Sequence, residues 1–121
     1  MPQLKIDNRF TMHYVLDDYT DPWRAPETVL MLHGNTESGV AWYGWAPHLA
    51  RHFRVLRPDM RGFGLSTPMP RDYPWTLDGL IDDYLALLHE LKVTRVHLVG
   101  AKLGGTVARC FAARCPALVR T

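Results

Sequence analysis

The sequence predicts an α/β fold in which a doubly wound, mostly parallel sheet forms a single domain. Short apolar stretches alternate with segments of helical spacing, in the order β-β-β-α-β-α-β-α. Residues 28–32 (TVLML) form an apolar run that is typical of a strand covered on both faces. A length of 121 residues with 47% hydrophobic content is sufficient for one modest core.

The N-terminal region predicts a hairpin followed by the first parallel strand. Residues 4–6 and 12–16 are short, partly alternating segments on either side of Asp7 and Asn8, and this pattern indicates a hairpin. A polar loop with two prolines then leads into the apolar run at residues 28–32. We therefore expect the sheet to begin with an antiparallel pair.

The middle of the chain predicts a helix, a strand and a long loop. Apolar residues at helical spacing indicate a helix over residues 42–52, in which Pro47 is tolerated only within the first turn. Residues 53–57 read as a strand that Pro58 ends. Residues 59–74 are rich in glycine and proline, as expected for a loop.

Two further helices and one strand follow. Thr76 is a good helix N-cap, and apolar residues recur at three and four positions over residues 77–91. Residues 96–99 are a strand, and residues 103–115 are a helix that Pro116 stops. The acidic residues of the helix over residues 77–91 are interpreted as its solvated face, and no chemical role is assigned to them: Asp78, Asp82, Asp83 and Glu90.

Composition argues against nucleic-acid and membrane partners. Lys and Arg total 14 against 12 Asp and Glu, and these charges are spread along the chain. The apolar runs are far shorter than the roughly 20 residues of a membrane-spanning helix. The N-terminus has no basic segment followed by an apolar one. We therefore expect a soluble, cytoplasmic protein.

The two cysteines indicate neither a disulfide nor a metal site. Cys110 and Cys115 are five residues apart on one expected helix, where they would point in different directions and lie too far apart to bond. Reduced thiols fit a cytoplasmic chain. Because the C-x-x-C spacing of common metal sites does not occur, we expect no metal and no organic cofactor.

Residues 100–104 (GAKLG) have the spacing of the G-x-S-x-G nucleophile elbow, with Lys102 in place of serine. They follow the strand at residues 96–99 and open an apolar helix. The flanking glycines allow a strand to turn sharply into a helix and hold the central residue strained and exposed. We therefore expect the sharp turn to form, but with Lys102 in place of serine it cannot carry out ordinary serine acyl transfer.

Three glycine-bearing segments leave the carboxyl ends of the predicted strands, the edge where such sheets bind ligands. They are residues 33–35 (HGN), 59–66 (DMRGFGLS) and 100–105 (GAKLGG). In this order and at these spacings they resemble the first half of an α/β-hydrolase, and the resemblance covers about residues 4–121. We therefore expect residues 1–121 to be the N-terminal half of a single α/β-hydrolase-like domain.

The resemblance implies roles for residues in two of these segments. It implies that the backbone N–H groups of Asn35 and Leu103 form an oxyanion hole, which stabilises a developing negative oxygen. Gly34 and Gly104 would let the backbone approach closely. His33 is expected to brace this loop rather than act as a base, because the family's catalytic histidine comes near the end of a longer chain.

The resemblance also suggests roles for nearby side chains. Asp59 and Arg61 are interpreted as a structural ion pair that shapes their loop. Trp42, Trp45 and Phe63 are candidates for lining the substrate pocket, although large aromatic residues are more often simply part of a core.

Lys102 leaves the reaction open. A helix N-terminus and partial desolvation both disfavour an ammonium ion, and a neutral amine can act as a base or form a Schiff base. A lysine that stays protonated would instead stabilise an oxyanion, enolate or carboxylate. The alternatives are therefore a lysine-dependent lyase or decarboxylase, a ligand-binding pseudoenzyme, and a serine enzyme altered at its nucleophile.

By resemblance, the substrate is a small, largely apolar ester, lactone or related carbonyl compound. The family's sheet continues beyond the helix at residues 103–115, and its later strands carry the triad acid and histidine. The strand at residues 96–99 would otherwise be an open apolar edge. We therefore expect a complementing C-terminal segment or chain as a partner.

Overall fold

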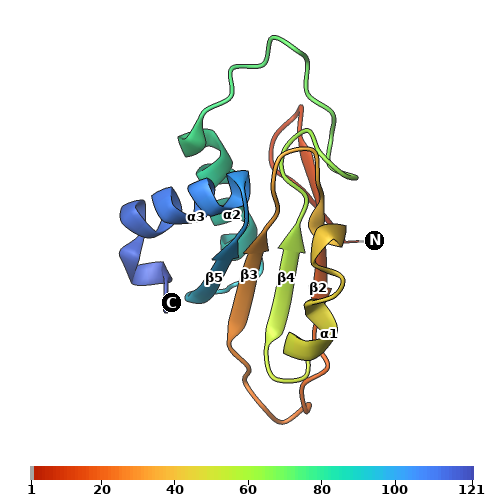
Figure 1. Cartoon of the computed structure of the whole chain (residues 1–121), viewed down its shortest axis with the longest axis vertical. Coiled ribbons are helices and arrows are strands. Elements are labelled where there is room, and N and C mark those ends of the chain that lie inside the picture. The colour runs from red at the N-terminus through yellow and green to blue at the C-terminus, as the bar shows by residue number, and fades with distance from the viewer. Residues whose placement is uncertain (1) are drawn as a thin grey trace.

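The computed structural model describes residues 2–121, which form a five-stranded sheet with the order β1-β2-β4-β3-β5. β3 pairs in parallel with β4 and β5, whereas β2 pairs antiparallel with β1 and β4. Figure 1 shows β5, β3, β4 and β2 side by side. The predicted α/β class and the N-terminal hairpin are confirmed. The strands are β1 (Gln3–Lys5), β2 (Thr11–Asp17), β3 (Thr28–Leu32), β4 (Arg54–Pro58) and β5 (Val96–Gly100).

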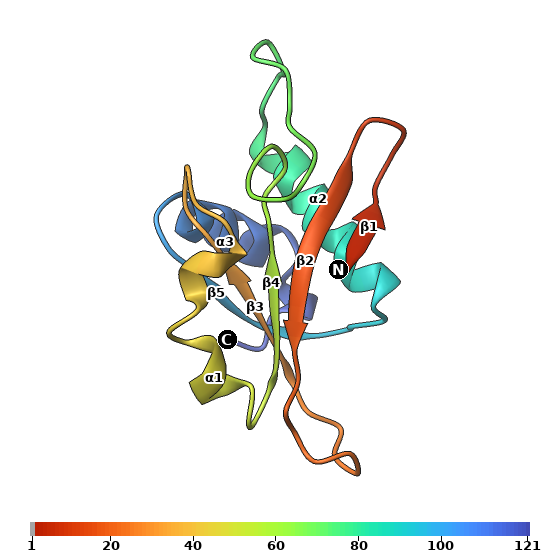
Figure 2. The ribbon, with the colours of Figure 1, turned by 90° about the vertical axis from the view of Figure 1, so that its right-hand side faces the viewer.

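β3 lies at the centre of two hydrophobic layers, and all five of its residues are buried. Successive side chains of a strand point to opposite faces. Leu30 and Leu32 therefore pack with α2 (Leu77–Glu90) and α3 (Leu103–Arg114), and Val29 and Met31 pack against α1 (Ala46–Leu49) on the other face. Figure 2 shows α1 and α2 on either side of the strands.

The ends of α2 follow from its sequence. Thr76 is extended, and its hydroxyl accepts a hydrogen bond from the N–H of Gly79 (3.0 Å), which confirms the predicted N-cap. Asp78 lies in the first turn, where a negative charge is favourable. Most of the predicted apolar pattern faces the core, and the buried residues are Leu80, Ile81, Tyr84, Leu87 and Leu88, whereas Leu77 at the start of the helix is exposed.

The helix predicted over residues 42–52 is wrong. The structure has a short 3-10 helix over Gly39–Trp42, followed by α1 over Ala46–Leu49. Pro47 lies in the first turn of α1. It has no N–H to donate to the preceding turn, so a continuous helix from Trp42 would be broken at this point. The helical spacing of the apolar residues continues across the break, which is why the pattern resembles one longer helix.

β5 is the last strand of the sheet, and the residues after α3 pair with its outer side. Val119 bridges Val96 in parallel. The N–H of Arg120 donates to the carbonyl of Val96 (2.7 Å), and the N–H of Leu98 donates to the carbonyl of Thr121 (2.8 Å). Figure 1 shows the C-terminus beside β5. The edge predicted to be open is thus partly covered by three residues.

Candidate functional site

The turn between β5 and α3 holds Lys102 in an unusual backbone conformation. Its φ is 57° and its ψ is −124°, outside the regions that residues with a side chain normally adopt. The turn is tight because the neighbouring glycines allow it. A Cβ at Gly100 would collide with the backbone of Gly104, and one at Gly104 would collide with the carbonyl oxygens of Leu32 and His33. The start of α3 is therefore packed directly onto the end of β3.

The loop after β3 lies beneath the Lys102 side chain. A Cβ built on Gly34 would lie 2.9 Å from Cβ and 3.0 Å from Cδ of Lys102, so the lysine stem passes over a position that only glycine can occupy. The next residue in this loop is Asn35, and the next residue in the turn is Leu103. The two loops thus bring these residues to the same edge of the sheet.

Two backbone N–H groups are available at this edge. Within residues 2–121, the N–H groups of Asn35 and Leu103 donate to no protein acceptor. Leu103 is the first residue of α3, and the first N–H groups of a helix have no partner within the helix. The positive end of the helix dipole lies here as well. The edge is suited to an electronegative atom.

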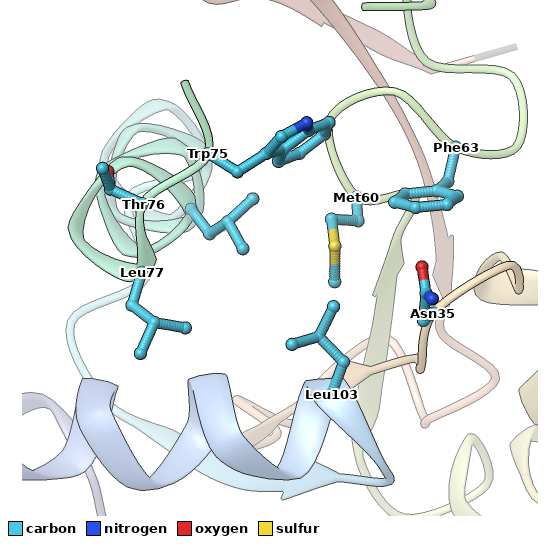
Figure 3. A pocket seen from close by; sticks show the side chains of 8 residues that line it. Asn35, Met60, Phe63, Trp75, Thr76, Leu77 and Leu103 are labelled. Atoms are coloured by element: carbon cyan, nitrogen blue, oxygen red, sulfur yellow. The ribbon is translucent and has the colours of Figure 1, made fainter. Parts of the chain in front are cut away.

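An open, largely apolar pocket of about 570 Å³ lies in front of these groups. Figure 3 shows Asn35 and Leu103 on one side, Met60 and Phe63 above them, and Trp75 and Leu77 across the gap. The pocket joins the loops after β3, β4 and β5 to the beginning of α2. Its lining residues are Asn35, Met60, Phe63, Trp75, Thr76, Leu77, Leu80 and Leu103.

The sequence identified only part of this lining. Phe63 lines the pocket, but the prediction for Trp42 is wrong, because Trp42 is buried on the opposite face of the sheet against Val29 and Val55. Trp45 also lies outside the lining. Sequence reasoning missed Trp75. The available signal was its position directly before the Thr76 N-cap, because a residue just before a helix lies close to the edge of the sheet where the strands end.

Lys102 does not have the desolvated environment that was expected. Its side chain is 71% exposed, and its Nζ lies 3.2 Å from Oε1 of Glu37. The loop that carries Gly34 and Asn35 also carries Glu37, so the turn and the loop are joined by an ion pair. Sequence reasoning did not single out Glu37.

Both ring nitrogens of His33 are engaged. Nε2 accepts a hydrogen bond from the backbone N–H of Met60 (2.8 Å), so Nδ1 carries the proton and donates to the carbonyl of Gly34 (2.7 Å). The ring is fully buried. It connects the loop after β3 to the loop after β4, and neither nitrogen is free to accept a proton from a ligand.

Asp59 and Arg61 do not pair with each other, contrary to the prediction. The Asp59 carboxylate accepts the N–H of Gly39 (2.7 Å) and of Leu65 (2.8 Å), and lies 2.9 Å from Nδ1 of His13. It therefore fixes the loops on either side of β4. Backbone N–H groups, which a sequence does not reveal as partners, take the place of the expected guanidinium.

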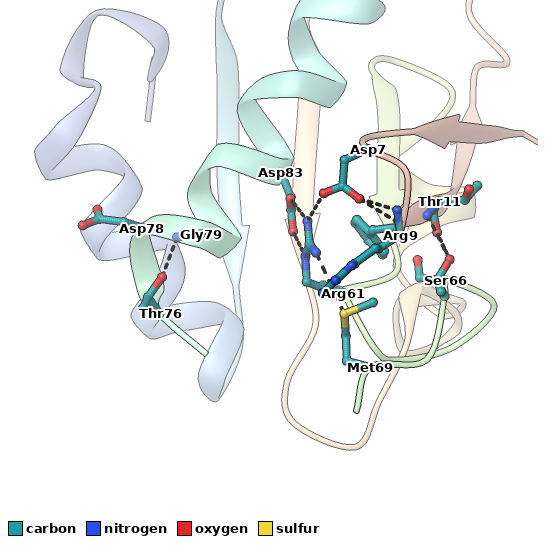
Figure 4. Close-up of polar contacts among 12 residues, drawn as sticks. Asp7, Arg9, Thr11, Arg61, Ser66, Met69, Thr76, Asp78, Gly79 and Asp83 are labelled. Atoms are coloured by element: carbon teal, nitrogen blue, oxygen red, sulfur yellow. Dashed lines mark hydrogen bonds and ion pairs between the residues drawn. The ribbon is translucent and has the colours of Figure 1, made fainter. Parts of the chain in front are cut away.

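Arg61 pairs instead with Asp83, which was expected to be solvated. Its Nε and one terminal nitrogen bond the two carboxylate oxygens at 2.9 and 2.8 Å (Figure 4). The guanidinium also lies 4.1 Å from the centre of the Phe10 ring. Burial raises the pKa of the Asp83 carboxyl, and the bonds from Arg61 oppose that shift. The pair attaches the loop after β4 to α2, next to the pocket.

Other polar groups are not arranged as a metal site. His48 and His52 are four residues apart, a spacing at which two imidazoles on one helix can share a metal, but α1 ends at Leu49. Across residues 2–121, no three His, Cys, Asp or Glu side chains are grouped as ligands. Cys110 and Cys115 are free thiols, as predicted.

In the part of the chain that the structure describes, no helix combines the length and the apolar character needed to cross a membrane.

Known proteins resemble the chain both in sequence and in architecture. Residues 27–121 match the family described as the alpha/beta hydrolase fold. The chain belongs to the α/β hydrolase fold family. A 2-hydroxy-6-oxo-2,4-heptadienoate hydrolase from Pseudomonas putida is 36% identical over 99 residues, which are 79% of this chain and 36% of that protein. A 2-hydroxymuconate semialdehyde hydrolase from Pseudomonas sp. is 37% identical over 95 residues, 76% of this chain and 33% of that protein.

Solved structures of α/β hydrolases superpose on nearly the whole chain. A hydrolase from Pseudomonas aeruginosa has a TM-score of 0.86 at 34% identity and covers 98% of this chain, which spans 42% of that structure. The enol-lactonase from Burkholderia xenovorans has a TM-score of 0.86 at 29% identity, covering 98% of this chain and 44% of its own. The chain spans about a third of the length of the curated relatives it matches.

Proposed function

We propose that the pocket binds a small, largely apolar carbonyl compound, such as an ester or a lactone. The observation that carries this proposal is the pair of unoccupied backbone N–H groups, on Asn35 and Leu103, at the edge of an apolar cavity. A carbonyl oxygen between them would accept two hydrogen bonds, which strengthen as negative charge develops on the oxygen. The hydrolase and lactonase names of the relatives support this class of ligand.

In this proposal Lys102 occupies the position of the nucleophile. The strained turn between β5 and α3 supports the assignment, because such a turn presents its central side chain at the edge of the sheet. The side chain of Lys102 is exposed and forms an ion pair with the carboxylate of Glu37. We therefore propose that Lys102 stabilises a negative oxygen and does not attack the carbonyl.

The lysine-dependent lyase is the alternative that needs a neutral amine. Treating the protein with a ketone and borohydride, followed by mass measurement, separates the two roles. An adduct on Lys102 would support an imine-forming enzyme. An unmodified Lys102, with the exposed lysines as an internal reference for reactivity, would support the electrostatic role.

A ligand-binding role without turnover is the second candidate, because His33 has both nitrogens engaged and offers no base beside the site. Turnover would then need a histidine and an acid carried by further strands. We propose that these strands extend the sheet at the outer side of β5, the side with which Val119–Thr121 pair. Lys102→Ser compared with Lys102→Ala decides this point. Ester hydrolysis by the serine variant alone supports an enzyme whose proton shuttle is present, and inactivity of both supports ligand binding.

The binding proposal is tested by following backbone amide signals during titration with 2-heptanone. We expect the signals of Asn35 and Leu103 to shift together. The control is a second apolar pocket of about 510 Å³, lined among others by Leu85 and Val93, in which the N–H of Val93 already donates to the carbonyl of Leu88 (2.9 Å). Equal shifts in both pockets, or none in the first, would refute the proposed site.

A further inference from the structure

Glu37 is the one charged partner that the structure gives to Lys102 within residues 2–121. Its carboxylate lies partly buried against the loop after β3, where Oε1 would be only 2.5 Å from a Cβ at Gly34. The carboxylate is thus close to the chain segment that also presents the N–H of Asn35. Nothing in the resemblance to α/β-hydrolases gives this residue a role.

The ion pair directs the lysine along the loop and out of the pocket. Leu103 and Asn35 both line the pocket, whereas Lys102 is not among its lining residues. Its stem runs across Gly34 toward Glu37. The Lys102 ammonium therefore lies beside the site, paired with the carboxylate of Glu37.

We propose that the ligand of this site is a carboxylate, which displaces Glu37 from Lys102 on binding, so that Glu37 determines specificity by position. The inference rests on the proposed function, because it uses the same pocket and the same two N–H groups. One carboxylate oxygen would accept from Asn35 and Leu103, the other would meet the ammonium, and an apolar tail would lie against Met60 and Phe63.

The exchange is physically easy. The Lys102 side chain is 71% exposed and that of Glu37 is 29% exposed, so the ion pair is open to water, and such pairs contribute little to stability. The lysine stem is flexible, so the ammonium can turn from Gly34 toward the pocket without movement of the backbone. A neutral carbonyl compound gains nothing from this movement, since it offers no charge to replace that of Glu37.

Hexanoate and 2-heptanone are matched probes, because both carry the same five-carbon chain on a carbonyl carbon. Affinities are measured from the amide shifts of Asn35 and Leu103. We expect Glu37→Gln to tighten hexanoate binding about two- to fivefold, the range set by an exposed ion pair, and to leave 2-heptanone unchanged. We expect Lys102→Gln to weaken hexanoate binding and spare 2-heptanone.

The control for charge is Asp82→Asn on α2, which removes the carboxylate from an exposed ion pair with Arg114 of α3. It should change neither affinity. If Glu37→Gln leaves hexanoate unchanged while both probes still shift the two amides, the inference is wrong and the proposed function stands. If Glu37→Gln tightens both probes equally, Glu37 acts by size and the inference is wrong. If neither probe shifts these amides, the proposed function itself fails.

Discussion

We expect Asp83→Asn to destabilise the fold strongly, although its neighbour Asp82 tolerates the same change. Asp83 faces the core from α2, its side chain is 5% exposed, and both of its oxygens bond Arg61. The substitution preserves shape and removes the charge. It leaves a guanidinium that is 10% exposed with a neutral partner that accepts through one oxygen only.

The magnitude follows from the burial of the pair. Removing one partner of a buried ion pair costs about 3 to 5 kcal/mol, because the other charge stays buried without compensation. Two features place the loss of unfolding free energy in Asp83→Asn at the lower end of this range, about 3 kcal/mol. Asp7 lies 3.7 Å from Arg61 and retains a negative charge there. Burial also raises the pKa of Asp83, so asparagine avoids part of the cost of an ionised carboxyl.

Thermal unfolding followed by circular dichroism measures the effect. A loss of this size lowers the melting temperature by roughly 10 °C in a domain of this length. Asp82→Asn is the matched control, since Asp82 is 60% exposed and pairs with Arg114 at the surface. Equal melting temperatures for the two variants would refute the claim that Arg61 and Asp83 hold the loop after β4 against α2.

Three further changes are expected to separate closely matched positions. Gly104→Ala should lower the free energy of unfolding in urea by about 1 to 3 kcal/mol, because the new Cβ would collide with the carbonyls at the end of β3. Gly105→Ala should be tolerated, since its Cβ would lie 3.5 Å from the nearest oxygen. Equal losses for the two variants would contradict this packing. A hydrogen bond with His97 lowers the pKa of Glu27. The wild-type protein should therefore be more stable than Glu27→Gln at neutral pH, and this difference in unfolding free energy should disappear as the pH falls below about 4. A difference that does not change with pH would contradict this expectation. Lys102→Gly should be more stable than Lys102→Ala by about 1 kcal/mol, because φ is 57° at this position, and the reverse order would show an unstrained turn.

The sequence was sufficient for the elements that have regular patterns and clear ends. The apolar run of β3, the Thr76 cap of α2 and the glycine turn before α3 each have a local cause, and the structure confirms them. The segment at residues 42–52 shows the limit. Its apolar spacing is real, but Pro47 prevents one continuous helix, and only Ala46–Leu49 form an α-helix within the segment.

The site was harder to predict because its polar partners are distant in sequence. Asp83 follows the acidic pattern of a solvated face, yet it is one of the buried residues of α2, where Arg61 meets it from a separate loop. Spacing along one helix does not reveal this. Lys102 stands in a recognisable motif, but its exposure and its ion pair with Glu37 depend on how two loops are placed side by side.

A crystal structure of the protein with bound hexanoate tests the central claim most directly. The account predicts one carboxylate oxygen within about 3 Å of the backbone nitrogens of both Asn35 and Leu103, with Lys102 turned away from Glu37 toward the ligand. A hexanoate whose carboxylate points to solvent, or whose tail occupies another cavity while Lys102 stays on Glu37, would contradict it.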